Sequence, residues 1–250
     1  MNKLMEKNAV RHAVIWMMLY ILMVNVGEMI SEKVGTTSAV TSVFVILFSL
    51  LLLKYLKNNS WVEKFGLNKI TKADLKKTLF YLPLIFIALI QFSAGIERSI
   101  SIETILVSCF MMIGVGFIEE LIFRGFLMDA IWKKSGMTRA ILISGITFGL
   151  GHIINLFRGY GYMEQLTQIL LAGGIGIILA LLVAITKNLV PGILFHIVFN
   201  ISGTISSQSA TKLTPYILIM IFVVCMGYSL YLMKSIKDIK TIPDEDKISV

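Results

Sequence analysis

Three ionisable residues interrupt an apolar run at residues 116–125, GFIEELIFRG. A charge at the centre of a bilayer costs roughly 3 kcal/mol or more, so ionisable residues in such runs are candidates for function. On a helix, Glu120 and Arg124 are four residues apart and share a face, where the arginine can offset the burial of the carboxylate. Glu119 points about 100° away and stays free for chemistry.

Two further apolar runs carry histidines. FGLGH contains Phe148 and His152, and HIVFN contains His196 and Asn200. Because His196 and Asn200 are four residues apart, both project from one face of a helix, and His152 must reach the same point from another helix. Counted from the nearest basic residue that ends each run, Glu119, His152 and His196 lie 14, 13 and 9 residues deep, or about 21, 20 and 14 Å.

These side-chain types predict hydrolytic chemistry. A carboxylate beside a histidine can take a proton from water. A second histidine and an asparagine can donate hydrogen bonds to the oxyanion of a tetrahedral intermediate. The spacing therefore predicts one hydrolytic site to which three helices contribute.

The elements that position this site are predicted to be membrane helices. The 250 residues are 56% hydrophobic and 15% charged, with a mean hydropathy of +0.83, well beyond the apolar share of a soluble domain. Runs long enough to cross a bilayer, about 20 residues, occur at 13–30, 38–56, 77–95, 102–132, 139–156, 166–186, 189–206 and 214–233. We therefore expect an all-α polytopic membrane helix bundle of about eight transmembrane helices.

The positive charges predict the orientation of this bundle. If the N-terminus is cytoplasmic, the inside segments hold 18 of the 23 lysines and arginines, so both termini are expected in the cytoplasm. The net charge of +8 then reflects topology and anionic headgroups, and nucleic acid is an unexpected partner because basic residues and aromatics do not interleave. Cys109 and Cys225 lie in different apolar runs and predict neither a disulfide nor a thiolate metal site.

Three regions follow from this pattern. Residues 1–76 form an N-terminal transmembrane pair with a cytoplasmic basic loop, 77–206 form the catalytic core, and 207–250 form the last transmembrane helix and a cytoplasmic tail. The first span resembles a signal peptide but is too long, so we interpret it as a retained signal anchor. The polar segment 57–77 is either a short helix in the headgroup region or a solvated loop. The tail TIPDEDKISV is expected to be disordered.

Small residues predict which helices are central. The fifth and sixth predicted spans carry glycines that allow close helix approach, at Gly145, Gly149, Gly151, Gly173, Gly174 and Gly176. Both spans are therefore expected inside the bundle. His12, at the start of the first span, is expected at the membrane interface, and Asn155 lines the cavity of His152 or caps the end of its span.

The three motifs together resemble a known family. E-E-x-x-x-R, F-x-x-x-H and H-x-x-x-N occur in this order on separate spans, as in the membrane-embedded CPBP family. That family comprises the type II CAAX prenyl endopeptidases and the bacterial bacteriocin-processing and immunity-associated (Abi) proteins. The resemblance covers roughly residues 77–206, and three motifs are far more specific than one. It implies that Glu120 and Arg124 hold the geometry of their helix.

The resemblance also implies catalytic roles. Glu119 and His152 would activate the attacking water, and His196 and Asn200 would form the oxyanion site. The family is often labelled metalloprotease, and Glu119, His152 and His196 could supply a zinc site with an open water position. Because the sequence has no H-E-x-x-H, a metal-free glutamate mechanism is equally open, and we slightly favour it.

The expected function is that of an intramembrane endopeptidase of the plasma membrane. Its partners would be the bilayer and a membrane-bound or lipidated peptide or protein, in CAAX-type processing, peptide maturation or bacteriocin immunity. A proton-coupled transporter is an alternative, since buried glutamate and histidine also make proton relays, but no repeated halves occur. A non-catalytic immunity or scaffold protein is the third hypothesis.

Overall fold

The computed structural model describes residues 1–70, 79–158, 161–206 and 214–241. These residues form helices and no strand; an isolated antiparallel bridge pairs Ile96 with Ser206. The elements are α1 (Asn2–Lys7), α2 (Ala9–Val34), α3 (Ala39–Asn58), η1 (Leu79–Tyr81), α5 (Leu82–Ile90), η2 (Gln91–Ala94), α6 (Ile102–Glu120), η3 (Leu121–Leu127), α7 (Met128–Ser135), α8 (Met137–Gly151), η4 (His152–Arg158), α9 (Tyr162–Thr186), α10 (Val190–Ile205) and α11 (Thr214–Thr241). The predicted all-α class is confirmed.

Length and hydropathy identify the helices that can cross a membrane. Within the described residues, six are long and apolar enough: Ala9–Val34, Ala39–Asn58, Ile102–Ser135, Met137–Leu156, Tyr162–Thr186 and Leu218–Ile236. Two of the predicted spans correspond to shorter apolar helices, Leu79–Ser93 and Val190–Ile205. The chain is therefore a polytopic membrane helix bundle, in which the second of these short helices carries His196 and Asn200.

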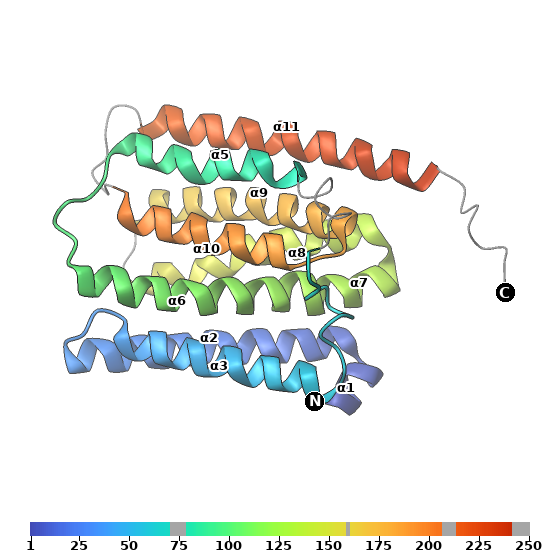
Figure 1. The fold of residues 1–250 in the computed structure, drawn as a ribbon, viewed down its shortest axis with the longest axis horizontal. Helices are drawn as coiled ribbons and strands as arrows, with labels where there is room; N and C mark the ends of the chain where they lie inside the picture. Colours follow the sequence, from blue (N-terminus) through green and yellow to red (C-terminus); the bar gives the residue numbers. More distant parts are fainter. Residues whose placement is uncertain (71–78, 159–160, 207–213, 242–250) are drawn as a thin grey trace.

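The helices run roughly along one long axis (Figure 1). The N-terminal pair, α2 and α3, joins the rest through contacts of α3 with α6 and of α2 with η3. α6 packs on α10, α8 packs on α9, and α11 and α5 cover α9 and α10, respectively. α6 therefore lies between the N-terminal pair and the C-terminal helices, with Glu119 and Glu120 in its last turn.

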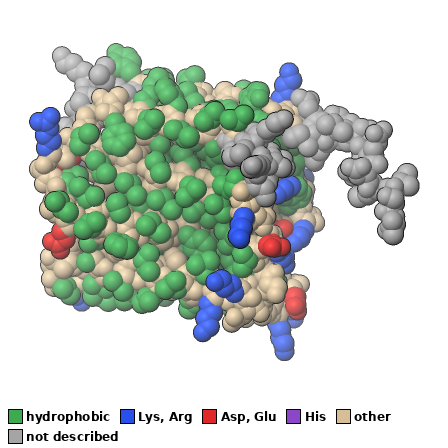
Figure 2. Space-filling model, in the orientation of Figure 1, with side chains coloured by type: hydrophobic (Ala, Val, Ile, Leu, Met, Phe, Trp, Pro, Cys, Tyr) green, Lys and Arg blue, Asp and Glu red, His purple; other side chains and the backbone are tan. Residues whose placement is uncertain are grey.

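The surface matches a membrane environment. Figure 2 shows hydrophobic side chains across the middle of one face and most of its lysines and arginines at one end, where the N-terminus and the C-terminal end of α11 lie. Large apolar side chains such as Leu22 and Met18 are 60% and 59% exposed on the described surface. Lipid contact explains this exposure, and the cytoplasmic location of the basic end stays a prediction.

Glycines bring α8 and α9 together as predicted. A Cβ on Gly145 would lie 2.7 Å from the backbone nitrogen of Ile177, and a Cβ on Gly149 would lie 2.7 Å from the carbonyl oxygen of Ile169. Gly151 has room, since the nearest atom to its Cβ would be 4.0 Å away. Gly174 instead faces Cys225 of α11. The close seam fixes the height of His152 relative to α9.

Aromatic side chains pack together at the basic end. The described part of the polar segment after α3, residues 59–70, is a loop of turns and irregular backbone, and its Phe65 is buried against Phe126. His12 is fully buried beside Tyr55, with its Nε2 2.9 Å from the phenol oxygen. An aromatic cluster explains the burial of both side chains, because packed rings bury a large apolar area. Residues 71–77 and the tail from 242 lie outside the described residues.

Candidate active site

A π-helical turn follows the two glutamates. α6 ends at Glu120, and η3 continues from Leu121 to Leu127 with π-helical geometry. Single π turns inside α-helices occur often at functional sites. The spacing of four still brings Arg124 Nη1 to 2.8 Å from Glu120 Oε1, so the predicted ion pair survives the change of helix type.

The Glu120–Arg124 pair is sealed from solvent. Both side chains have no exposed area. Arg124 donates from Nη2 to the carbonyl oxygen of Gly176 at 3.2 Å, and its guanidinium lies 4.4 Å from the ring centre of Phe148. These contacts offset the desolvation of the charges, and breaking such a buried pair leaves an uncompensated charge. The pair therefore stabilises the end of α6 on the face that carries Glu120.

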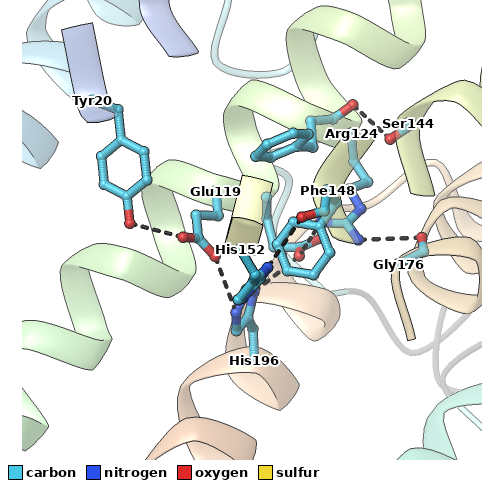
Figure 3. Close-up of polar contacts among 10 residues, drawn as sticks. Tyr20, Glu119, Arg124, Ser144, Phe148, His152, Gly176 and His196 are labelled. Carbon is cyan, nitrogen blue, oxygen red and sulfur yellow. Dashed lines mark hydrogen bonds and ion pairs between the residues drawn. The ribbon is translucent and has the colours of Figure 1, made fainter. Parts of the chain in front are cut away.

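His196 stands between the two carboxylates. Its Nδ1 is 3.1 Å from Glu120 Oε1, and its Nε2 is 3.3 Å from Glu119 Oε2 (Figure 3). An ionised carboxylate only accepts hydrogen bonds, so an imidazolium satisfies both contacts, whereas a neutral ring satisfies one. His196 thereby links the face of α6 that carries Glu120 to the face that carries Glu119.

The side chain of Glu119 is more exposed than that of Glu120. Its side chain is 15% exposed, and its Oε1 accepts a hydrogen bond from the hydroxyl of Tyr20 at 2.8 Å (Figure 3). Tyr20 comes from α2, in the N-terminal pair. The sequence analysis missed it, because one tyrosine in an apolar span carries no spacing signal that links it to a residue 99 positions away.

His152 begins η4, directly after α8. Its Nδ1 is 3.2 Å from the carbonyl oxygen of Phe148, which can only accept, so the hydrogen of a neutral ring resides on Nδ1 and Nε2 is the acceptor. The ring of Phe148 packs edge-on against both His152 and His196, with centroids 5.4 and 5.6 Å apart. The spacing of four residues in F-x-x-x-H thus has a local explanation, because the phenylalanine orients both imidazoles.

Two cavities meet at these residues. The larger, of about 720 Å³, is lined by Gln91, Met112, Val115, Glu119, Phe148, His152, Gln168, Leu171, Ala172, Ile175, Leu179, Phe195, His196, Phe199, Asn200, Gly203 and Thr204. The smaller, of about 180 Å³, is lined by Met17, Tyr20, Ile21, Val24, Asn25, Glu119, Phe123, Phe148, Gly151, His152, Ile154 and Asn155. Glu119, Phe148 and His152 belong to both linings.

All six predicted site residues meet in one region. Four of them line the larger cavity, and Glu120 and Arg124 lie buried behind it. Asn155 lines the smaller cavity, where its amide donates to Gln168 at 3.2 Å. The first of the two alternatives for Asn155 therefore fits, although the cavity is the smaller one.

The side chains do not form a preassembled metal site. Among the described residues, no group of three or more histidine, cysteine, aspartate or glutamate side chains has an arrangement that could hold a metal ion. Both ring nitrogens of His196 face carboxylates, and Nδ1 of His152 faces a backbone carbonyl. Glu119, His152 and His196, the possible zinc ligands, are therefore not grouped around a common point for a metal, although Nδ1 contacts with a carboxylate or a carbonyl also occur in metal-ligating histidines. The chemistry below uses the side chains alone.

Comparison with known proteins gives one family match. Residues 101–202 match the family model described as type II CAAX prenyl endopeptidase Rce1-like. Neither a curated protein nor a solved structure matches the chain significantly. The matched segment runs from the start of α6 to α10 and contains all three motifs. This segment, which holds both glutamates and both site histidines, is similar to the Rce1-like family of type II CAAX prenyl endopeptidases.

Proposed function

We propose that this protein is an intramembrane endopeptidase that hydrolyses a peptide bond near the end of a lipidated or membrane-associated peptide. One observation carries the proposal: Glu119 lines a cavity of about 720 Å³ together with His152, His196 and Asn200. Buried groups of this kind are expensive inside a membrane bundle unless they serve a reaction or a transport path. The family match favours the reaction.

Glu119 acts as the general base in this proposal. The oxygen of a water molecule bonds to the scissile carbonyl carbon while one water proton passes to Glu119. His152 accepts the second hydrogen bond of that water through Nε2 and orients it. The C–N bond then breaks, the proton held by Glu119 moves to the leaving nitrogen, and the products are a carboxylic acid and an amine.

The oxyanion forms on the side of α10. Asn200 offers an amide N–H, and Nε2 of His196, 3.3 Å from Glu119 Oε2, offers a second donor when the ring is protonated. Preorganised donors of this type are worth about 3 kcal/mol each in the transition state. Glu120 orients the ring of His196 through its contact with Nδ1 at 3.1 Å, and Arg124 fixes Glu120.

The lining of the larger cavity favours an apolar substrate. Its walls include Leu171, Ile175, Leu179, Phe195 and Phe199 from α9 and α10. Apolar side chains or a lipid chain would bury area there at about 25 cal/mol per Å². A few polar groups at one end, near Glu119, would fix the peptide bond. We propose entry from the cytoplasmic leaflet, in line with the predicted topology.

The test uses purified protein in liposomes and two peptides of one sequence, each ending in cysteine and three apolar residues, with and without a farnesyl group on the cysteine. We expect release of the terminal tripeptide, faster from the lipidated peptide, and its loss in Glu119→Ala at an unchanged unfolding temperature. Wild-type protein inert toward both peptides, or a variant as active as the wild type, would contradict the proposal. Equal rates for both peptides would replace the lipidated substrate by an apolar one.

A further inference from the structure

Two cavities share one wall at Glu119, Phe148 and His152. The larger one extends toward α9 and α10, and the smaller one extends toward α2 and the start of η4. A carboxylate that borders both spaces can meet different molecules from each side. The side chains that line each cavity therefore indicate which molecule that cavity binds.

The smaller cavity has the polar groups that ordered water requires. Besides Glu119 and His152, its lining includes Tyr20, Asn25 and Asn155. A water needs two to four polar partners and about 30 Å³ of space, so 180 Å³ has room for up to about six waters. The space is too small for a peptide segment, since binding sites for drug-sized ligands begin at about 300 Å³.

Substrate in the larger cavity would displace water from it. An apolar peptide or lipid chain that fills the space beside α9 and α10 leaves Glu119 without solvent on that side, because burial of apolar surface expels water. Hydrolysis still consumes one water per turnover. The wall formed by Glu119 and His152 has its other side toward α2, where the polar lining of Tyr20 and Asn25 lies.

We propose that the smaller cavity is the water chamber of this enzyme: it binds the hydrolytic water and its reserve on the α2 side of Glu119, while the substrate occupies the larger cavity. This inference rests on the proposed peptidase function. It gives the N-terminal pair, which lies outside the segment matched to the family, a part in the reaction. The attack then proceeds from the α2 side toward a carbonyl group held on the α10 side.

Water itself is the probe in the first experiment. Native protein in lipid nanodiscs is exposed to a short X-ray pulse, which converts water to hydroxyl radicals, and methionine oxidation is read by mass spectrometry. Met17 lines the chamber, and its neighbour Met18 is 59% exposed on the lipid-facing surface. We expect Met17 to oxidise at least tenfold faster than Met18. Equal, slow oxidation of both residues would show a dry cavity and overturn the proposal.

The second experiment asks whether the chamber serves turnover. Val24 lines it, so Val24→Phe reduces its volume, and Leu22→Phe adds a ring on the exposed surface of the same helix as a control. We expect Val24→Phe to lower kcat at least tenfold with KM within twofold. Ala172→Phe, in the larger cavity, should raise KM instead. A rise in KM alone for Val24→Phe would make the smaller space part of the substrate site.

The two experiments separate two kinds of failure. Rapid oxidation of Met17 in a protein that cleaves no peptide would leave the hydrated chamber in place and remove the peptidase function. Peptide cleavage by a protein whose Met17 stays unoxidised would keep the function and overturn the chamber. Unfolding temperatures of Val24→Phe and Leu22→Phe are compared first, and Leu22→Phe should retain the wild-type kcat.

Discussion

Glu119 and Glu120 are adjacent in the sequence, yet the two sides of α6 give them different surroundings. Glu120 has no exposed area and is held by Arg124 and His196 at 2.8 and 3.1 Å. Glu119 is 15% exposed, borders two cavities and is held by Tyr20. We call these the sealed side and the open side. The difference shows that the helix rotation of about 100° per residue is enough to separate a supporting carboxylate from an accessible one.

Substitutions on the sealed side should lower stability more than substitutions on the open side. Arg124→Met leaves Glu120 as an uncompensated buried charge, which costs about 3–5 kcal/mol of folding free energy. We expect a large fall in the unfolding temperature, measured by differential scanning fluorimetry in detergent. The double variant Glu120→Leu/Arg124→Leu is the control, since it removes both charges and should recover much of the loss. A single variant as stable as the wild type would remove the distinction between the two sides.

Substitutions on the open side should lower kcat instead. His152→Ala removes the group that orients the water, and we expect kcat to fall about 100-fold, within the usual range for general acid–base groups. Because His152 is only partly buried and its ring bonds to the carbonyl of Phe148 in the last turn of α8, the unfolding temperature should change little. Loss of folding without a separate effect on kcat would place His152 on the structural side of the comparison.

The close seam between α8 and α9 holds residues of both the sealed side and the open side in place. Gly149→Val puts a Cβ 2.7 Å from the Ile169 carbonyl oxygen, and overpacking of this kind costs about 1–3 kcal/mol. Gly151→Val is the matched control, since its Cβ would have 4.0 Å of clearance. We expect only the first variant to unfold at lower temperature. Equal thermal shifts for the two variants would contradict the close helix approach.

Tyr20 should have the smallest effect. Tyr20→Phe removes the hydroxyl that holds Glu119 Oε1 at 2.8 Å, and a hydrogen bond to a charged group is worth about 1.5 kcal/mol or more. We expect kcat to fall about tenfold, with KM and the unfolding temperature unchanged. Tyr55→Phe is the control, because its hydroxyl contacts His12 rather than the site. Equal kcat values for the two variants would show that Tyr20 does not position the carboxylate.

Much of the fold could be predicted from the sequence, because apolar runs and glycine patterns are local signals. The eight apolar runs correspond to helices, and Gly145 and Gly149 lie in the close seam between α8 and α9. The polar motifs also predicted which residues meet, since helix spacing of four fixes a shared face. Their catalytic roles stay predictions, because they come from the family resemblance rather than from geometry.

Other features depend on contacts between distant segments, which spacing does not encode. The partner of Glu119 comes from α2, and the position of His196 between two carboxylates depends on how α10 packs on α6. The π turn after Glu120 also escaped the sequence analysis, which assumed an uninterrupted α-helix. At the basic end, burial of Phe65 and His12 results from an aromatic cluster that brings together α2, α3, the following loop and η3.

The central claim, that the two adjacent carboxylates have separate roles, is tested most directly by two isosteric variants measured in parallel. Unfolding temperature and kcat are determined for Glu119→Gln and Glu120→Gln with the same lipidated peptide. We predict that Glu119→Gln keeps the wild-type unfolding temperature and loses at least 100-fold in kcat, while Glu120→Gln unfolds several degrees lower because Arg124 loses its counter-charge. A Glu119→Gln variant that retains wild-type turnover, or a Glu120→Gln variant as stable as the wild type, would contradict the account.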